Sequence, residues 1–516
     1  MGVKVLFVVK EIEGAEPIGA LYVAGCLEQA GHVCRFVGTR GNEVLEEVAR
    51  FEPDVVAFGA TTGLHRYYLG LAAAIKARFP NVLTLMGGPH ATYYPEVVKT
   101  PGIDVVCRGE GEDAAVELCD AIANRADFTR IRDLWVKHEG RVFANEPREL
   151  RRDLDSIPFP PRRLLYEYDD SLRDRPLKSF TTNRGCPFPC SYCFNPSLVD
   201  HYGSSWKKVR IRSPENVVRE ISEVREQGPL QVIGFRESIF VYSTQWLREF
   251  GEIYKREIGL PYYCHVRGDM MTDEMVELLR WSGCHTVNLG IETANEKLAN
   301  DVLKRHIKMD KLIAGVKRLK KAGIVVFADN IVGIPSGTLE DDLATLDLNI
   351  ELDVDYAAAT LCTPYPGTGI AKFAEENGYF DGDYDAIEQS YYTTSVVKFR
   401  DDREKRRIEN LHKLFAVVAA LPALRPLLTT RLLDLPPNDF FYAVFRAWYY
   451  VCHVTDVMPR RPSIDQLAEG VASIFGIYRG VDPNLAFPTP EPVDMPIEKN
   501  APPIKLRKSL EVVHAT

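Results

Sequence analysis

The sequence of 516 residues contains no long hydrophobic run. Its longest uninterrupted apolar stretch, Leu414 to Leu421, is far shorter than the roughly 20 residues that cross a bilayer as a helix. The apolar stretch Val5 to Val9 is followed at once by Lys10 and Glu11, as in a first buried strand and unlike a secretory signal. We therefore expect a cytoplasmic protein without a transmembrane segment, whose eleven cysteines are reduced.

The sequence also lacks an excess of positive charge. Its 63 lysine and arginine residues face 72 aspartate and glutamate residues, for a formal net charge of −9. Proteins dedicated to nucleic acids carry the opposite balance, so we expect no nucleic-acid partner. The basic and then apolar stretch Arg403 to Leu433 is compatible with peripheral membrane contact, but an ordinary helical core is the favoured interpretation.

Three cysteines stand close together without a fourth metal ligand nearby. Cys186, Cys190 and Cys193 form a C-x3-C-x2-C pattern, and no second Cys or His pair of suitable spacing follows them. A structural zinc site needs four ligands, so the pattern argues against zinc. Three thiolates instead suit an iron–sulfur cluster with one open iron, in the tight loop that Gly185 and Pro187 favour. Three buried or disulfide-forming cysteines are the alternative interpretation.

This pattern, with the aromatic residue Tyr192 before the last cysteine, resembles the signature of the radical S-adenosyl-L-methionine (SAM) superfamily. The resemblance implies that Cys186, Cys190 and Cys193 are catalytic and ligate a 4Fe-4S cluster whose open iron chelates SAM. It also implies that electron transfer into the sulfonium yields a 5'-deoxyadenosyl radical. The fold expected with it is a partial (β/α)6 barrel resembling part of a TIM barrel.

Before the cysteines, short apolar runs alternate with helical patterns, which predicts a parallel sheet covered by helices. The expected strands are residues 3–9, 54–58, 82–86 and 105–107, and the expected helices are residues 18–29, 67–78 and 113–123. In such a doubly wound, Rossmann-like domain, ligands bind at the carboxyl ends of the strands. Those ends carry small polar loops with glycines, at residues 59–63, 87–90 and 108–112.

The last two of these loops resemble loops of the cobalamin-binding domain that precedes many radical SAM domains. The residues expected to contact cobalamin are Thr61, Thr62, Gly87, Gly88, Gly109, Glu110 and Glu112. The Asp-x-His-x-x-Gly element of methionine-synthase-like domains is absent, so cobalamin would bind base-off without that histidine. His65 and His90 are conceivable neighbours of the corrin, although loop histidines more often bond the backbone. A nucleotide-binding or flavodoxin-like domain fits the same alternation.

After the cysteines the alternation resumes, with functional residues expected at strand ends. The expected strands end at residues 183, 235, 266, 289, 331 and 361. Glu237 matches the position of the family's acidic residue that receives the methionine amino group, where aspartate is common. Glu292 lies in a segment that resembles one near the SAM ribose, and Gly333 and Pro335 lie in one similar to the adenine contact. Together with Arg267, these residues are the predicted SAM contacts.

Five regions follow from these patterns. They are a cobalamin-binding Rossmann-like domain (1–135), a linker (136–178), a radical SAM partial barrel (179–370), a helical C-terminal domain (371–485) and a proline-rich tail (486–516). The predicted fold class is therefore α/β with a helical C-terminal part. An aromatic-rich helix is expected over residues 440–451, as helical core rather than as a substrate pocket.

Together the resemblances imply a cobalamin-dependent radical SAM enzyme. The leading hypothesis is methyl transfer to an unactivated carbon or phosphorus of a small molecule, with a reductant such as flavodoxin or ferredoxin as electron source. Oxidation, cyclisation or rearrangement without methylation, as in anaerobic porphyrin ring cyclases, is one alternative. A non-catalytic cobalamin or iron–sulfur sensor is another.

Overall fold

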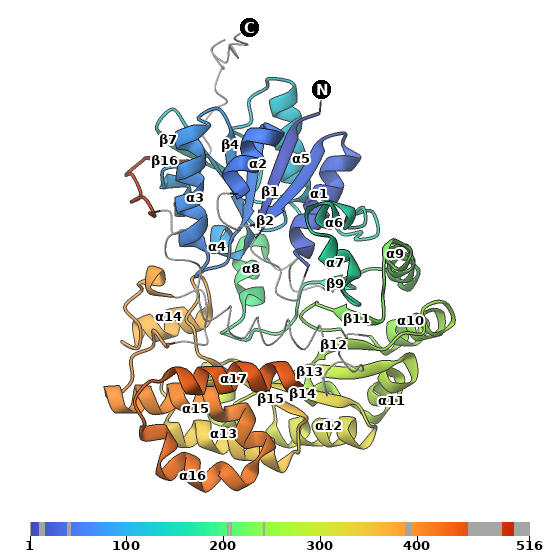
Figure 1. Cartoon of the computed structure of the whole chain (residues 1–516), viewed down its shortest axis with the longest axis vertical. Helices are drawn as coiled ribbons and strands as arrows, with labels where there is room; N and C mark the ends of the chain where they lie inside the picture. Colours follow the sequence, from blue (N-terminus) through green and yellow to red (C-terminus); the bar gives the residue numbers. More distant parts are fainter. Residues whose placement is uncertain are drawn as a thin grey trace. The chain divides into compact units, whose positions relative to one another are not determined.

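The structure, a computed structural model, describes residues 2–9, 16–38, 43–203, 206, 209–240, 243–387, 394–452 and 488–499. The chain divides into two compact units (Figure 1). The first contains Met1–Arg151, Ser156–Leu172 and Leu485–Thr516, and the second contains Arg152–Asp155 and Arg173–Asn484. Each unit has a sheet and a hydrophobic core of its own.

An eight-stranded sheet of order β16-β7-β6-β5-β4-β3-β1-β2 forms the centre of the first unit. Its strands are β1 (Lys4–Val9), β2 (Val33–Gly38), β3 (Val55–Gly59), β4 (Leu83–Gly87), β5 (Val105–Cys107), β6 (Leu134–His138), β7 (Arg141–Ala144) and β16 (Ile497–Lys499). Its helices are α1 (Ile18–Gln29), α2 (Glu43–Phe51), α3 (His65–Arg78), α4 (Gly88–Tyr93), α5 (Glu112–Ala123) and α6 (Arg163–Tyr168). The strands β1 to β5 pair in parallel in the order 2-1-3-4-5, a doubly wound arrangement that confirms the predicted fold.

Several elements of this unit were not expected. β2 and α2 lie where no strand or helix was predicted, because Arg35 and the exposed Val33 interrupt the buried apolar pattern of β2. β7 and α6 lie within the predicted linker, and β16 within the predicted tail. β16 pairs in parallel with β7, with Ile497 opposite Val142. The five region boundaries stay predictions, but parts of the supposed linker and tail belong to a folded sheet.

A six-stranded parallel sheet of order β15-β14-β13-β12-β11-β8 forms the centre of the second unit. Its strands are β8 (Leu177–Phe180), β11 (Val232–Phe235), β12 (Tyr262–Val266), β13 (Cys284–Glu292), β14 (Val325–Val332) and β15 (Tyr356–Leu361). The short strands β9 (Asn183–Arg184) and β10 (Arg210–Ile211) pair with each other after β8, which ends three residues earlier than predicted. Sequential parallel strands are those expected of a partial (β/α)6 barrel.

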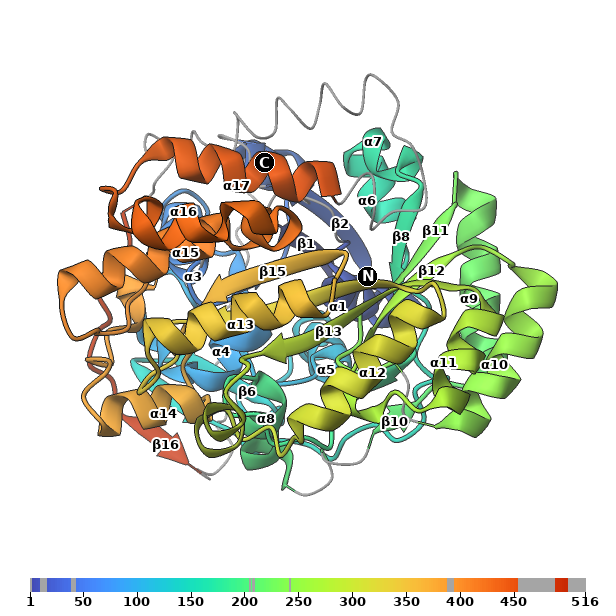
Figure 2. The same ribbon diagram turned by 90° about the horizontal axis from the view of Figure 1, so that it is seen from below.

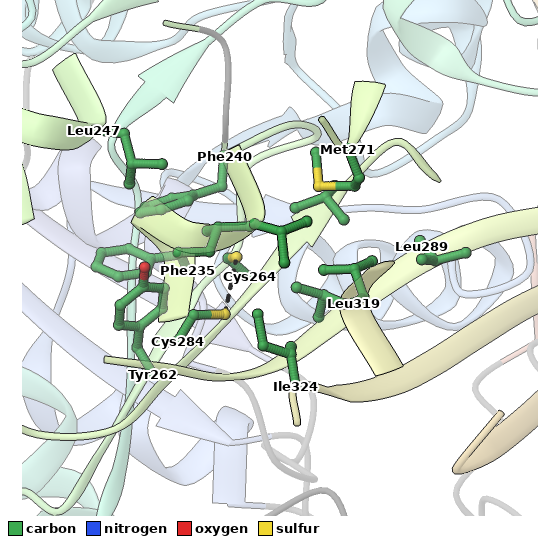
Figure 3. Packing of buried hydrophobic residues seen from close by; sticks show 14 of the residues in the cluster. Phe235, Phe240, Leu247, Tyr262, Cys264, Met271, Cys284, Leu289, Leu319 and Ile324 are labelled. Atoms are coloured by element: carbon green, nitrogen blue, oxygen red, sulfur yellow. Dashed lines mark hydrogen bonds between the residues drawn. The ribbon is translucent and has the colours of Figure 1, made fainter. Parts of the chain in front are cut away.

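Helices alternate with the strands of this unit, and most of them lie along the outside of the sheet (Figure 2). They are α8 (Phe194–Tyr202), α9 (Pro214–Gln227), α10 (Thr244–Glu257), α11 (Asp273–Ser282), α12 (Met309–Lys321), α13 (Leu339–Glu351) and α14 (Gly369–Glu376); α7 (Asp170–Asp174) precedes β8. Between strands and helices lies a core that includes Phe235, Phe240, Tyr262 and the neighbouring thiols of Cys264 and Cys284, whose sulfurs are 3.9 Å apart (Figure 3). These thiols are core residues.

The helical C-terminal part packs on the same sheet. It comprises α15 (Asp402–Ala420), α16 (Arg425–Thr430) and α17 (Asp439–Cys452), and α17 confirms the predicted aromatic helix. Leu411 and Phe415 of α15 are buried with Val332 and Leu361 of the sheet, so these helices belong to the second unit. Residues 453–485 of the predicted helical domain lie outside the described residues. In the described part of the chain, no helix has the length and apolar character needed to cross a membrane.

Candidate active site

The loop that carries the three cysteines follows β8 and is held by later segments of the second unit. The Ser191 backbone N–H donates to Leu303 O at 2.9 Å, and the Ser191 hydroxyl donates to Val302 O at 2.6 Å. Ser191 O in turn accepts from the Ile370 N–H at 2.8 Å. The loop is therefore fixed against the segments that follow β13 and β15, at the carboxyl edge of the parallel sheet.

Each of the three cysteine sulfurs has an N–H donor. The donors are the Phe188 N–H for Cys186, Arg267 Nη1 for Cys190 at 3.9 Å, and both Asn195 N and Nδ2 for Cys193 at 3.5 Å. Burial, with smaller contributions from the other two thiols, raises the pKa of the Cys186 thiol to about 11. A metal binds the deprotonated thiolate, which burial disfavours. An N–H donor to the sulfur stabilises the thiolate and therefore favours the form that binds a metal.

The three thiols of the loop influence one another electrostatically. Among the described residues, no three His, Cys, Asp or Glu side chains could together hold one metal ion. The three thiols are still close enough for Cys190 and Cys193 to shift the pKa of Cys186. In a cuboidal cluster each thiolate ligates a different iron, so the sulfurs stand further apart than the ligands of one ion. The loop therefore fits a three-thiolate cluster.

Glu237 lies buried just beyond the end of β11. Its carboxylate accepts the Thr182 hydroxyl at 2.7 Å and the Thr182 N–H at 3.3 Å. Asn183 donates to Ile239 O at 2.9 Å, which ties the two loops together on both sides of the carboxylate. Burial raises the pKa of Glu237 to about 7, although the bonds from Thr182 act in the opposite direction. A carboxyl with this pKa can change its charge near neutral pH.

Glu292, the last residue of β13, bends back over its own strand. Its φ is +64°, and a Cβ added to Gly290 would lie only 2.0 Å from Glu292 Oε1. The Tyr192 hydroxyl of the cysteine loop donates to Oε1 at 2.8 Å. Burial raises the pKa of Glu292, whereas the charge of Arg305 and the Tyr192 bond lower it. The predicted carboxylate and the cysteine loop are thus in direct contact.

Arg305 completes this end of the sheet. Its guanidinium donates to Gly290 O at 2.8 Å and Ile291 O at 2.7 Å, where the register of β13 with β14 shifts. Lys304 and His306 on either side have φ values of +51° and +50°. Left-handed non-glycine residues are strained and persist where surrounding contacts enforce them, often at functional sites. The strained turn places a buried positive charge beside Glu292.

The other predicted SAM contacts lie after β12 and β14. Arg267 immediately follows β12 and is buried, with its guanidinium 3.9 Å from the centre of the Phe188 ring. Gly333 follows β14 with φ +69°, and its N–H donates to Asp342 Oδ2 at 3.0 Å. Pro335 lies in the same turn. The structure therefore brings Glu237, Glu292, Arg267 and the loop of Gly333 to one edge of the sheet.

A polar strip that no motif indicated lies on the sheet face opposite the helices. His265 of β12 stands beside Asn288 of β13 in the register, and Asn288 hydrogen-bonds Asp329 of β14. Burial lowers the pKa of His265 to about 4 and raises that of Asp329 to about 7. Tyr263 packs against Gly234 of β11, where an added Cβ would lie 2.8 Å from its ring. The inner face therefore offers a neutral imidazole and a carboxyl that can change its charge near neutral pH.

The predicted cobalamin loops are joined to one another in the first unit. The Ala60 N–H donates to Gly87 O at 2.9 Å, and Ala60 O accepts the His90 N–H at 3.0 Å. The Gly109 N–H donates to Thr92 Oγ1 at 3.0 Å. Hydrogen bonds thus connect the loops after β3, β4 and β5, and with them the predicted contacts Thr61, Thr62, Gly87, Gly88, Gly109, Glu110 and Glu112.

The two histidines near these loops are buried and stacked. The rings of His65 and His90 are 4.0 Å apart, and each side chain is 2% exposed. His65 Nδ1 accepts from the Gly63 N–H at 3.1 Å, and His90 Nδ1 lies 3.0 Å from Thr62 Oγ1. Burial lowers the pKa of His90 to about 3. Both histidines therefore brace the loops through hydrogen bonds.

Comparisons with known proteins agree with this geometry. Residues 7–119 match the description "B12 binding domain", and residues 180–348 match "Radical SAM superfamily". Over 368 residues the chain is 31% identical to the uncharacterized methyltransferase PH0819 of Pyrococcus horikoshii, covering 70% of this chain and 79% of that protein. The chain belongs to the cobalamin-binding radical SAM enzyme family.

One further relative and one solved structure are similar to this chain. The chain is 29% identical over 406 residues to the anaerobic magnesium-protoporphyrin IX monomethyl ester cyclase of Rubrivivax gelatinosus, covering 74% of this chain and 70% of that one. The radical SAM methyltransferase TsrM of Kitasatospora setae has a TM-score of 0.61 at 20% identity, over 73% of this chain and 78% of that chain. TsrM therefore shares the fold.

As a cobalamin-binding radical SAM enzyme, the protein uses a 4Fe-4S cluster, SAM and cobalamin. The donor set of the cysteine loop fits the cluster, since each sulfur has an N–H partner. Small side chains and connected backbones at the ends of β3, β4 and β5 fit a large flat ligand. No sequence pattern pointed to Arg305 or Thr182, because their hydrogen-bond partners are distant in the sequence.

Proposed function

We propose that the protein methylates an unactivated carbon or phosphorus centre of a small molecule. The observation that supports this most directly is that one chain carries a three-thiolate loop and a cobalamin-type domain. When bound, the cluster supplies the electron that cleaves SAM to a 5'-deoxyadenosyl radical, and cobalamin supplies the methyl group. The chain's own residues hold these groups and exclude water from them.

We assign the residues of the second unit as follows. Cys186, Cys190 and Cys193 hold the cluster. Glu237 accepts a hydrogen bond from the SAM amino group, and Glu292 accepts hydrogen bonds from the ribose hydroxyls. Gly333 and Pro335 supply backbone next to adenine; because the Gly333 N–H is engaged by Asp342, the contact falls on neighbouring backbone atoms.

In the first unit, the seven predicted loop residues hold cobalamin. We propose base-off binding without a histidine ligand from the Asp-x-His-x-x-Gly element, which the sequence lacks. We also propose a cytoplasmic setting with flavodoxin or ferredoxin as electron donor.

A second function is oxidation or cyclisation without methylation. The relative in Rubrivivax gelatinosus favours it, since its name describes a cyclase and the similarity extends over 74% of this chain. The two functions differ in what happens to the SAM methyl group. They therefore predict different SAM-derived products from one incubation.

The deciding experiment uses anaerobically reconstituted protein with SAM, a strong reductant, and hydroxocobalamin present or omitted. 5'-Deoxyadenosine and S-adenosylhomocysteine are then quantified by mass spectrometry. Methylation predicts both products, with the second dependent on cobalamin. 5'-Deoxyadenosine alone would favour the second function, and neither product from protein with a complete cluster would contradict both.

The pKa of Glu237 predicts a pH dependence of SAM binding. With a ligand-free pKa of about 7, the carboxyl is increasingly protonated below that pH and loses strength as an acceptor. We expect the SAM dissociation constant, relative to that of Glu237→Gln, to increase as the pH falls from about 8 to about 6, by up to about tenfold per unit below pH 7. Equilibrium SAM binding by both proteins measures this ratio.

The same pKa shift has a consequence for folding. The folded state keeps the Glu237 proton to higher pH than the unfolded chain does, so this group's contribution to stability falls as the pH rises from about 4.5 to about 7. The variant Glu237→Gln should lack this component of the unfolding profile. A SAM binding ratio that stays constant across the pH range would remove Glu237 from the proposed contacts.

A substitution at Gly88 tests whether the proposed loops bind cobalamin. Its φ is +89°, and an added Cβ would lie 2.7 Å from Ala60 O, so Gly88→Ala must open the bonded loops. We expect cobalamin affinity to fall at least about tenfold, measured by absorption during titration with hydroxocobalamin. Gly31→Ala is the matched control, because Gly31 also has φ +89° but nothing within 4 Å of its added Cβ. Normal cobalamin binding by Gly88→Ala would contradict the assignment.

A further inference from the structure

Arg267 holds a fixed positive charge beside one cysteine of the cluster loop. Its Nη1 donates to Cys190 Sγ at 3.9 Å, and the Arg267 side chain is only 10% exposed. Nε and Nη2 donate to the two Asp269 oxygens at 3.0 and 3.1 Å, and Nη2 also donates to Arg305 O at 3.1 Å. The guanidinium plane rests on Phe188 of the cysteine loop.

The Arg267 guanidinium is held in place because its partner Asp269 lies in a tightly packed turn. Asp269 lies in the 3-10 turn Gly268–Met270 directly after Arg267. That turn packs so closely on α12 that a Cβ added to Gly315 would lie 1.8 Å from Gly268 O. A bidentate arginine–aspartate pair and an aromatic stack both require a planar guanidinium, which lysine does not provide.

Charge and hydrogen bonding at a cysteine sulfur change the reduction potential of an iron–sulfur cluster. A nearby cation and an N–H donor stabilise the more negative, reduced state and therefore raise the reduction potential. These contacts also use most of the N–H groups of the Arg267 guanidinium. Within the described part of the chain, one Nη1 N–H of Arg267 remains for other partners.

We infer that Arg267 is a positioning residue for Cys190 that raises the reduction potential of the bound cluster, and that it is not a main SAM contact. The inference rests on the proposed function, since it requires the cluster. It replaces the role that the sequence predicted for Arg267 and explains why this arginine contacts the cysteine loop at both Phe188 and Cys190.

The test compares anaerobically reconstituted wild-type protein with Arg267→Gln, Arg267→Lys and the control Arg318→Gln. Arg318 also bonds an aspartate and a main-chain carbonyl, Asp273 Oδ1 at 3.1 Å and Met271 O at 3.3 Å. Iron and sulfide are quantified in each protein. The midpoint potential is then measured by following the paramagnetic reduced cluster by electron paramagnetic resonance during a redox titration, and SAM affinity is measured separately.

We expect a lower potential in Arg267→Gln, a smaller decrease in Arg267→Lys, and a wild-type value in Arg318→Gln, with SAM affinity changing less than threefold, roughly half a tenfold step. A wild-type potential in Arg267→Gln with a full cluster would overturn the inference, as would an unchanged potential with a large loss of SAM affinity. If Arg267→Gln takes up no cluster, Arg267→Lys decides by the same criterion. Failure of wild-type protein to take up a cluster would instead refute the proposed function.

Discussion

Replacing Cys190 with alanine should remove the cluster and, with it, all SAM cleavage. Cys190 is the most buried of the three thiols and the one that Arg267 contacts, so the two remaining cysteines cannot hold a cuboidal cluster in this loop. Iron and acid-labile sulfide should fall to background after anaerobic reconstitution, the visible absorption should disappear, and 5'-deoxyadenosine should fall below detection. Circular dichroism should remain that of the wild type, because the main-chain anchors at Ser191 are unchanged.

The matched control for this prediction is Cys264→Ala. Cys264 is also a buried free cysteine of the second unit, but it lies in the hydrophobic core against Cys284 rather than in the loop. Losing its sulfur should cost about 1 kcal/mol of stability and leave iron, sulfide and SAM cleavage unchanged. Full iron and sulfide in Cys190→Ala would contradict the ligand assignment, and loss of cluster in Cys264→Ala would show that core packing alone governs uptake.

The sequence predicted well those elements in which the apolar pattern is not interrupted. α1 and β5 were predicted with their observed bounds, because their apolar residues repeat without interruption. β2 was missed because Arg35 and the exposed Val33 interrupt its pattern, although Arg35 pairs with Glu47 of α2. β16 was missed because β7, its sheet partner among the described strands, lies some 350 residues earlier in the chain.

The candidate site shows a similar division. Local spacing was sufficient for the cysteine loop, and the ends of strands were sufficient for Glu237 and Glu292. Arg305 was not predictable, because it reaches Gly290 and Ile291 only through the strained turn between Lys304 and His306. Spacing alone does not encode such a turn when glycine is absent.

The polar strip on the inner face of the sheet is a further feature that could not be predicted from the sequence. His265 and Asp329 occur in strands that read simply as apolar with occasional polar residues. Their proximity to Asn288 depends on the register of three adjacent strands, which a single sequence does not specify. The same register places Gly290 next to Asp329, so one row of the sheet joins this strip to the bend that carries Glu292.

Gly290 makes that bend possible, and Gly290→Ala should therefore weaken SAM binding without unfolding the protein. The added Cβ would lie 2.0 Å from Glu292 Oε1 and 2.8 Å from its Cδ, both at the far end of a flexible side chain. The backbone of Gly290 is not left-handed, so alanine adds no strain there, and the carboxylate can move away. The cost in stability should be about 1 kcal/mol or less.

The displaced carboxylate would lose the Tyr192 hydroxyl at 2.8 Å and its place beside SAM. A charge-assisted hydrogen bond contributes about 1.5–3 kcal/mol, so the SAM dissociation constant should increase about 10- to 100-fold in Gly290→Ala. Glu292→Gln, which removes the charge but keeps the shape, should give a similar increase, whereas Tyr192→Phe should have a smaller effect because the carboxylate stays in place. Wild-type SAM affinity in both Gly290→Ala and Glu292→Gln would exclude Glu292 as a SAM ligand, and wild-type affinity in Gly290→Ala alone would show that the carboxylate reaches SAM from more than one position.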